Sequence, residues 1–201
     1  MNKPFSEACE ENKSVILEAI SSSLRPGIKV LEIGSGTGQH AVFFAAKHPQ
    51  VVWQSSDRAE NLNGIKAWIR DAGLPNLPPP LNLDVCAIWP ELKYDLIFSA
   101  NSLHIMGESA VALCLSQCAA HLHAGARLII YGPFNYQGKY TSESNAHFDA
   151  WLKSRDIESG IRHFEWVNAL ALEAGMKLID DVAMPANNRV LIWQRITDSL
   201  E

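Results

Sequence analysis

Residues 30–38 read Val-Leu-Glu-Ile-Gly-Ser-Gly-Thr-Gly, and this stretch decides the fold. Val30, Leu31 and Ile33 are strand formers without a helical period, whereas residues 41–46 continue as an apolar helix. The three glycines therefore lie in a turn from a strand into a helix. Glycine adopts positive φ and lets a ligand approach the backbone, and the N-terminus of the next helix favours negative charge. The stretch predicts a ligand with an adenosine-like part at the tip of this strand. A tight turn without a ligand is the alternative.

The spacing of the glycines distinguishes between cofactors. A dinucleotide fingerprint reads G-x-G-x-x-G, but Gly34, Gly36 and Gly38 are one residue closer together than that. Glu32 would also face a bound pyrophosphate, which is unfavourable, whereas a cofactor with a cationic ammonium and sulfonium suits this acid. The pattern E-x-G-x-G-x-G resembles motif I of class I S-adenosylmethionine (SAM) methyltransferases.

Composition and charge narrow the class of protein. The chain has 201 residues, of which 47% are hydrophobic and 19% charged, as in one soluble globular domain spanning residues 1–201. Neither a signal core nor an apolar run of membrane-spanning length is visible, so we expect a cytoplasmic protein that does not bind membranes. The net charge is −5 and no Lys/Arg cluster occurs, which argues against nucleic acid as a partner. The four cysteines form no C-x-x-C pair, and no metal site is predicted. The sequence gives no indication of oligomeric state.

Strand-like and helix-like segments alternate along the chain, which predicts an α/β fold with a Rossmann-like, mostly parallel sheet and helices on both faces. A first helix is expected over residues 7–24, and further helices over 59–72, up to about 123, and over 161–174. Seven strands are expected at 29–33, 51–55, 81–83, 94–100, 127–132, 178–183 and 189–193. The last two are joined by only a few residues, so they must form a hairpin and the last strand runs antiparallel. Residues 133–160 interrupt the alternation as a lid-like insertion.

Polar residues follow several of the expected strands, where open α/β sheets bind their ligands. Asp57 could accept hydrogen bonds from both ribose hydroxyls of an adenosine, although NAD enzymes place an acid there too. In SAM enzymes an acid at the position of Asp84 accepts from the adenine amino group, and the backbone of Val85 reaches a ring nitrogen. A helix N-cap is the alternative role for Asp84. Asn101 could line the methionine side of the pocket.

Over nearly its whole length the chain resembles a class I SAM-dependent methyltransferase. It is further similar to an uncharacterised methyltransferase-like family, which is classified as a domain of unknown function. The segments behind this closer resemblance are Phe5-Ser-Glu-Ala, Glu11-Asn-Lys13, Ile33–His40, Asn101-Ser-Leu-His104, Gly132-Pro-Phe134, Thr141–Asn145, Gly160-Ile-Arg162 and Met184–Asn188. The resemblance implies SAM binding by Glu32, Gly34, Ser35, Gly36, Gly38, Asp57, Arg58, Asp84, Val85, Asn101 and Asn12. It supplies no substrate.

One departure from related enzymes restricts the acceptor. Methyltransferases that act on adenine N6 or on amide nitrogens tend to carry a D/N/S-P-P-Y-like segment after the fourth strand. This chain has Asn101-Ser-Leu-His104 instead, without prolines or an aromatic residue. Nucleobase and glutamine methylation are therefore disfavoured, and we expect a small-molecule substrate.

The candidate catalytic and substrate-binding residues come from two later segments. Methyl transfer needs a base only when the nucleophile arrives protonated, and His104 is the candidate base, with Asn101 beside it; a purely structural histidine is the alternative. The aromatic and polar insertion suggests a substrate lid with the contact residues Phe134, Tyr136, Tyr140 and Asn145. An ordinary covering loop with a short helix is equally compatible with it.

Three functions are compatible with the sequence. The leading hypothesis is a SAM-dependent methyltransferase for an unidentified small molecule. The alternative is a non-catalytic or regulatory SAM-binding protein on the same fold, because fold alone does not fix function. A nucleotide-dependent oxidoreductase is a third, which the glycine spacing disfavours.

Overall fold

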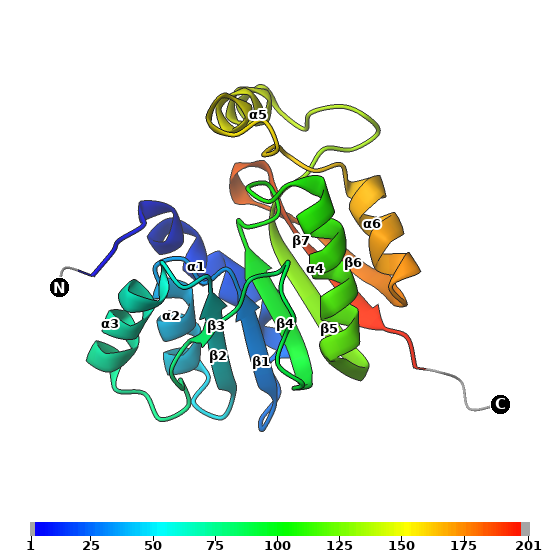
Figure 1. Ribbon diagram of the computed structural model, residues 1–201. Coiled ribbons are helices and arrows are strands. Elements are labelled where there is room, and N and C mark those ends of the chain that lie inside the picture. Colours follow the sequence, from blue (N-terminus) through cyan, green and yellow to red (C-terminus); the bar gives the residue numbers. More distant parts are fainter. Residues whose placement is uncertain (1–2, 198–201) are drawn as a thin grey trace. The chain divides into compact units, whose positions relative to one another are not determined.

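The computed structural model describes residues 3–197, and its strands form one seven-stranded sheet in the order β3-β2-β1-β4-β5-β7-β6 (Figure 1). By its internal contacts the chain divides into two compact units, residues 1–99 and 100–201. The predicted fold class, a Rossmann-like mixed sheet with helices, is confirmed. The single domain predicted from the length of the chain stays a prediction.

The first unit contains the parallel strands that follow from the opening stretch. β1 (Lys29–Ile33) pairs in parallel with β2 (Val52–Asp57) and with β4 (Tyr94–Ala100), and β2 pairs in parallel with the short β3 (Leu81–Asn82). The helices α1 (Glu7–Ile20), α2 (Gln39–Lys47) and α3 (Leu62–Ala72) accompany these strands (Figure 1). Ser6 caps α1 by accepting from the Cys9 N–H, as its position before three acidic residues suggests.

The core of the first unit is aromatic. Phe44 on α2 packs edge-to-face against Trp53 of β2 and Phe98 of β4, with ring centroids 5.0 and 5.6 Å away. All three side chains are fully buried. Burial of aromatic area on this scale stabilises the sheet against the helices, and edge-to-face geometry adds about 0.5–1.5 kcal/mol for each pair.

The second unit contains the antiparallel end of the sheet. α4 (Glu108–His121) leads into the long β5 (Leu122–Pro133), which pairs antiparallel with β7 (Asn188–Arg195). β7 also pairs antiparallel with β6 (Met176–Met184), and the two are joined through the 3₁₀ turn Pro185–Asn187. This is the hairpin that the sequence predicts. Two further helices, α5 (Glu143–Arg155) and α6 (Phe164–Glu173), lie between β5 and β6 in the chain.

Several boundaries differ from the predictions for physical reasons. The first helix ends at Ile20 rather than residue 24, since the run of three serines forms a 3₁₀ turn in which the Ser21 hydroxyl donates to the Glu18 carbonyl. The fifth strand starts at Leu122 rather than residue 127, because the left-handed Gly125 (φ 75°) bends the strand without ending it. In the insertion, the helix α5 occupies Glu143–Arg155.

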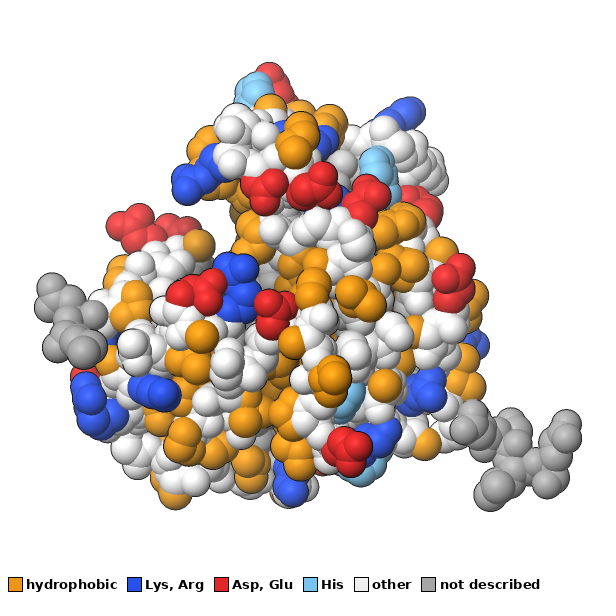
Figure 2. Space-filling view, viewed as in Figure 1, with side chains coloured by type: hydrophobic (Ala, Val, Ile, Leu, Met, Phe, Trp, Pro, Cys, Tyr) orange, Lys and Arg blue, Asp and Glu red, His pale blue; other side chains and the backbone are white. Residues whose placement is uncertain are grey.

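One face of the molecule carries charges of both signs. Acidic and basic side chains are interspersed on the face that Figure 2 shows. Among residues 3–197, no helix combines the length and the apolar character that crossing a membrane requires.

Candidate functional site

The glycine turn has the backbone geometry that its sequence predicts. Gly34, Gly36 and Gly38 have φ angles of 69°, 56° and 90°, a region in which side chains with a Cβ are strained. A Cβ on Gly36 would meet no atom within 4 Å, whereas one on Gly38 would lie 3.2 Å from Cα of Ile65 on α3. Gly38 is therefore required for helix packing, and Gly36 borders open space that a ligand could enter.

Asp57 is held in a fixed orientation beside this turn. Its Oδ2 accepts from the N–H of Gly36 at 2.7 Å, and its Oδ1 accepts from the N–H of Arg58 and from Nδ2 of Asn61, both at 2.8 Å. The side chain is 8% exposed. An ionised carboxylate has about four acceptor positions, so one remains on the Oδ2 side for a ligand hydroxyl.

Glu32 lies under the turn and is closed off from solvent. Its carboxylate is 1% exposed, and Oε2 accepts from the Ser35 hydroxyl and from Nε1 of Trp53, both at 3.0 Å. Burial, opposed by these two hydrogen bonds, raises the pKa of Glu32 to about 7. In this arrangement Glu32 and Ser35 support the turn from inside, and a direct contact between Glu32 and a cofactor stays a prediction.

The start of the chain is fastened to the helix that follows the glycines. Gln39 accepts from the backbone N–H of Ser6 at 2.7 Å, and its amide group donates to Glu10 at 2.8 Å. His40 Nε2 donates to Oδ1 of Asn12, also at 2.7 Å. Burial lowers the pKa of His40 to about 4, so the ring is neutral at pH 7. His40 thus holds Asn12 beside the start of α2, and the role of Asn12 toward a cofactor stays a prediction.

The remaining residues predicted to bind the cofactor lie at the ends of β2 and β3. Arg58 is exposed and pairs with Glu60 at 2.8 Å, so only its backbone contacts Asp57. Asp84, two residues past β3, is also exposed and accepts from the N–H of Cys86 at 2.9 Å. Val85 next to it is partly exposed. Because β2 and β3 are paired at Asp57 and Asn82, these ends lie side by side.

In the second unit, the two predicted catalytic side chains face one glycine. A Cβ on Gly132 would lie 3.8 Å from Nδ1 of His104 and 3.9 Å from Oδ1 of Asn101. Asn101 has a left-handed backbone (φ 55°), and its N–H donates to the carbonyl of Tyr131 at 2.9 Å. Burial and the nearby charge of Arg162 lower the pKa of His104 to about 4. The imidazole is therefore neutral near pH 7 and offers a lone pair.

Arg162 fixes the loop that carries His104. Its guanidinium is largely buried and donates to the backbone carbonyls of Leu103, Met106 and Glu158. The N–H of Gly160 donates to the carbonyl of His104 at 2.8 Å. The Gly160-Ile-Arg162 segment therefore has a structural purpose, which is to hold residues 103–106 in place. Phe148 of α5 packs edge-to-face against the His104 ring, with the ring centroids 5.3 Å apart.

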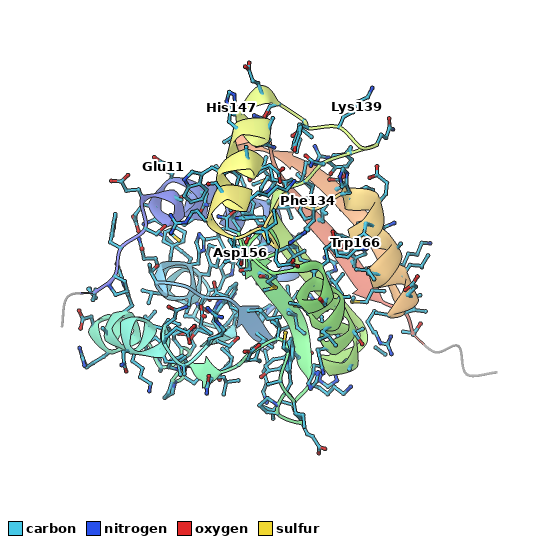
Figure 3. The ribbon with its side chains drawn as sticks, turned by 45° about the horizontal axis from the view of Figure 1, so that its top comes forward. Glu11, Phe134, Lys139, His147, Asp156 and Trp166 are labelled. Carbon is cyan, nitrogen blue, oxygen red and sulfur yellow. The ribbon has the colours of Figure 1, made fainter. Side chains whose placement is uncertain are left out.

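The four residues predicted to bind substrate have different environments. Phe134 is 1% exposed and is labelled beside α5 in Figure 3. Tyr140 donates to Asp149 at 2.7 Å, and Asn145 is buried and donates to the Thr141 hydroxyl at 2.8 Å. Of these four residues, Tyr136 is in the lining of the cavity described below. The roles of all four toward a substrate stay predictions.

Sequence reasoning missed Gln39, His40 and Arg162 as organisers of these sites. Gln39 and His40 directly follow the glycine turn, which is the one sequence signal that could have identified them. Arg162 has no such local signal, because the carbonyls it binds are up to 59 residues away in the chain.

Comparison with solved structures supports the fold. A human N-acetylserotonin methyltransferase in complex with SAM superposes with a TM-score of 0.80 at 16% identity, covering 95% of this chain and 53% of that one. The SAM-dependent methyltransferase SibL gives a TM-score of 0.80 at 21% identity over 94% of this chain and 56% of that one. An O-methyltransferase family protein from Burkholderia thailandensis gives 0.79 at 14% identity, covering 94% and 58%. The chain thus spans somewhat more than half the length of these proteins, and at such identities the likeness shows the fold.

One protein family matches almost the entire chain. The profile of the family described as protein of unknown function (DUF938) matches residues 3–195. This range includes the glycine turn, Asp57, the His104 loop and the closing hairpin. The chain belongs to the family of proteins of unknown function DUF938, on the fold of SAM-dependent methyltransferases.

Proposed function

We propose that this protein is a SAM-dependent methyltransferase that acts on a small-molecule acceptor. The observation that carries the proposal is the glycine turn at 34–38 with Asp57 oriented beside it by three N–H donors. The methyltransferase fold of the structural neighbours supports methyl transfer as the chemistry.

The residues present suit SAM. Gly36 leaves open space against the backbone, and Asp57 has a free acceptor position for ribose hydroxyls. Asp84 and Val85 would hold the adenine, and Asn12 would approach from α1. When bound, SAM supplies a methyl group on a sulfonium, which transfers by in-line displacement. Much of the rate can then come from holding the acceptor in the attack geometry.

The roles that we propose for Asn101 and His104 follow from the neutral imidazole of His104 and from the contacts that fix its loop. The neutral His104 accepts a hydrogen bond from the acceptor hydroxyl and orients it, with the Asn101 amide oxygen beside it. A pKa of about 4 gives little driving force for removing a proton from a hydroxyl in the ground state. Orientation is therefore the larger part of the role that we propose for His104.

Calorimetry with SAM, S-adenosylhomocysteine and NAD tests the cofactor. We expect the first two to bind and NAD not to bind. Asp57→Ala should weaken binding of S-adenosylhomocysteine at least tenfold, and Asp71→Ala, an exposed acid on α3 in the same unit, should leave it unchanged. Preference for NAD, or equal affinity of the two variants, would show that the adenosine site lies elsewhere.

A turnover assay separates the enzyme from a regulatory binding protein. Protein that binds SAM is incubated with methyl-labelled SAM and a fractionated small-molecule extract, and transfer of label is measured. His104→Gln keeps a hydrogen-bonding side chain of similar size, and we expect it to lower kcat more than tenfold while SAM affinity stays unchanged. Binding of SAM without transfer to any fraction would favour the regulatory reading.

A further inference from the structure

A cavity of about 380 Å³ lies in the second unit between the loop after β5 and the tip of the β6–β7 hairpin. It is lined by Tyr136, Thr141, Met184, Asn187, Asn188 and Arg189, among others. Cavities of about 300–1,000 Å³ are usual for small-molecule sites. The loop whose outer end is marked by Lys139 and the hairpin below α5 can be followed in Figure 3.

Among residues 3–197, the lining of this cavity contains one charged side chain, and its charge is positive. Arg189 is the charged residue in its lining, and no carboxylate lines it among the residues that the structure describes. The other polar groups are the Thr141 hydroxyl and two asparagine amides. Such a lining favours an anionic group over a cationic one, because Arg189 offers N–H donors to an anion whereas a cation would find no carboxylate among the described lining residues.

Arg189 is held so that part of its guanidinium stays free for a ligand. Its Nε donates to Oδ1 of Asp181 at 2.7 Å, and its Nη2 donates to the Asp181 carbonyl at 2.9 Å. Arginine has five N–H donors, and the two donors to Asp181, together with a side-chain hydrogen bond with Tyr136, leave part of the Nη1/Nη2 edge for a ligand. That pair is the geometry that binds a carboxylate bidentately.

Tyr136 and Asp181 keep the guanidinium in this position. The Tyr136 hydroxyl donates to Asp181 at 2.9 Å, and burial together with Asp181 raises the pKa of this tyrosine well above its usual value. The Tyr136 ring lies between Phe164, stacked at 5.1 Å, and the Arg189 guanidinium at 5.6 Å. An arginine held on three sides loses little conformational entropy when a ligand binds.

The β5–β7 register relates the lining of the cavity to the loop of His104. Gly132 is the register partner of Arg189, and Pro133 is the partner of Asn188. Side chains directly opposite in an antiparallel pair point to the same face. Arg189 therefore lies on the face of Gly132 that His104 and Asn101 approach.

The hairpin tip is built with a conformational cost. Ala186 and Asn187 both have left-handed φ angles, 55° and 58°, although neither is glycine. A left-handed alanine costs about 1–2 kcal/mol. Asn145 holds this tip from α5 by donating to the Asn187 carbonyl at 3.3 Å, and such strain persists where surrounding structure enforces it.

We propose that this cavity binds the methyl acceptor, and that the acceptor carries a carboxylate which the Nη1/Nη2 pair of Arg189 receives. This inference rests on the proposed function, because it names the substrate class of the same enzyme. Thr141, Asn187 and Asn188 would hold the remaining polar groups of the acceptor.

Titration by NMR tests the substrate class with probes of known charge. The wild-type protein loaded with S-adenosylhomocysteine is titrated with benzoate and hexanoate and, separately, with benzamide and hexanamide. We expect at least one carboxylate to shift the side-chain amide signals of Asn187 and Asn188 and to bind tenfold more tightly than its amide. Equal affinity of acid and amide in both pairs, or shifts confined to other regions, would overturn the proposal.

Variants of Arg189 provide the second measurement. Arg189→Gln should abolish the preference for the carboxylate. Arg189→Lys keeps the positive charge but loses the planar pair of N–H groups, so it should retain a smaller preference of about threefold. Arg155→Gln changes a surface arginine at the end of α5 and serves as the control. A carboxylate preference that survives in Arg189→Gln would also overturn the proposal.

The outcomes separate the two levels of inference. Binding of S-adenosylhomocysteine without carboxylate preference rejects the acceptor class and leaves the methyltransferase proposal standing. Carboxylate binding at Asn187 and Asn188 without any binding of SAM or S-adenosylhomocysteine rejects the methyltransferase, and with it the role of the cavity as an acceptor site.

Discussion

At the residue scale, Glu32 is unusual because a buried carboxylate supports the glycine turn. Its pKa near 7, against an ordinary value of 4.5, means that the folded protein keeps this carboxyl protonated over a range in which the unfolded chain ionises it. The Glu32 contribution to the free energy of unfolding therefore falls as pH rises from about 4.5 to 7 and is constant above that.

Replacing Glu32 should remove this dependence. Relative to the wild type, Glu32→Gln should gain stability between pH 4.5 and pH 8 by on the order of 3 kcal/mol. Urea unfolding at both pH values measures it. Glu11→Gln, an exposed acid on α1, is the control and should show no such difference. Parallel pH profiles of Glu32→Gln and the wild type would contradict the assignment.

Cys9, His40 and Asn12 form a row of three side chains in which each contacts the next. The Cys9 sulfur lies 3.9 Å from Nδ1 of His40, whose Nε2 binds Asn12. This order of groups occurs in cysteine nucleophiles. Here, however, burial raises the pKa of the Cys9 thiol and lowers that of His40 to about 4, so both groups are neutral at pH 7.

We therefore expect Cys9 to react slowly with a thiol reagent, since the thiolate is the reactive form. In Ellman's assay on the native protein at pH 7.5, the rapid phase should come from the exposed Cys86. Cys86→Ser should remove that phase and Cys9→Ser should leave it in place. Rapid labelling of Cys9 would instead indicate a thiolate–imidazolium pair.

At the scale of elements, the buried acid Asp149 contributes to the attachment of α5 to the rest of its unit. Asp149 is 2% exposed, and it accepts from the N–H of Ile161, the Tyr140 hydroxyl and the Lys153 ammonium, each at 2.7 Å. Burial alone would raise the pKa of Asp149, but these three donors lower it overall. The attachment is therefore complete above about pH 4 and weakens as pH falls through the carboxyl pKa.

Removing this acid should loosen α5. Asp149→Ala leaves the buried N–H of Ile161 without a partner and removes the bonds to Tyr140 and Lys153, and we expect it to cost about 3 kcal/mol. Hydrogen exchange should accelerate over residues 140–162. Asp156→Ala is the matched control, because the Asp156 carboxylate is exposed and accepts from the nearby Glu158 N–H. Equal exchange in both variants would show that other contacts hold α5.

The boundaries of elements were predictable where local chemistry defines them. β1 and β4 have the predicted limits, because each is a short apolar run ended by a turn signal. β5 was predicted too short, because its pairing with β7 begins at Arg127, the predicted start, but the strand itself begins at Leu122. A glycine such as Gly125 does not show from the sequence alone whether a strand ends there or continues through it.

At the scale of the whole molecule, ligand binding should raise stability by mass action. S-adenosylhomocysteine at 100 times its Kd should add about 2.7 kcal/mol to the free energy of unfolding. For a chain of 201 residues this corresponds to a Tm increase of about 5–10 °C, measured by calorimetry. Asp57→Ala should show a much smaller increase at the same concentration, and NAD should give none. A shift with NAD and none with S-adenosylhomocysteine would contradict the proposed cofactor.

The sequence by itself determined the alternation of strands and helices, the left-handed glycine turn and the antiparallel hairpin. These follow from hydrophobic period and from the φ angles that glycine tolerates, and both act over a few residues. Only the tertiary structure decided that Glu32 is sealed under the turn by Trp53, 21 residues away, and that Tyr136 and Arg189 converge on Asp181, 45 and 8 residues away. Burial and pKa depend on neighbours that pack together only once the chain has folded.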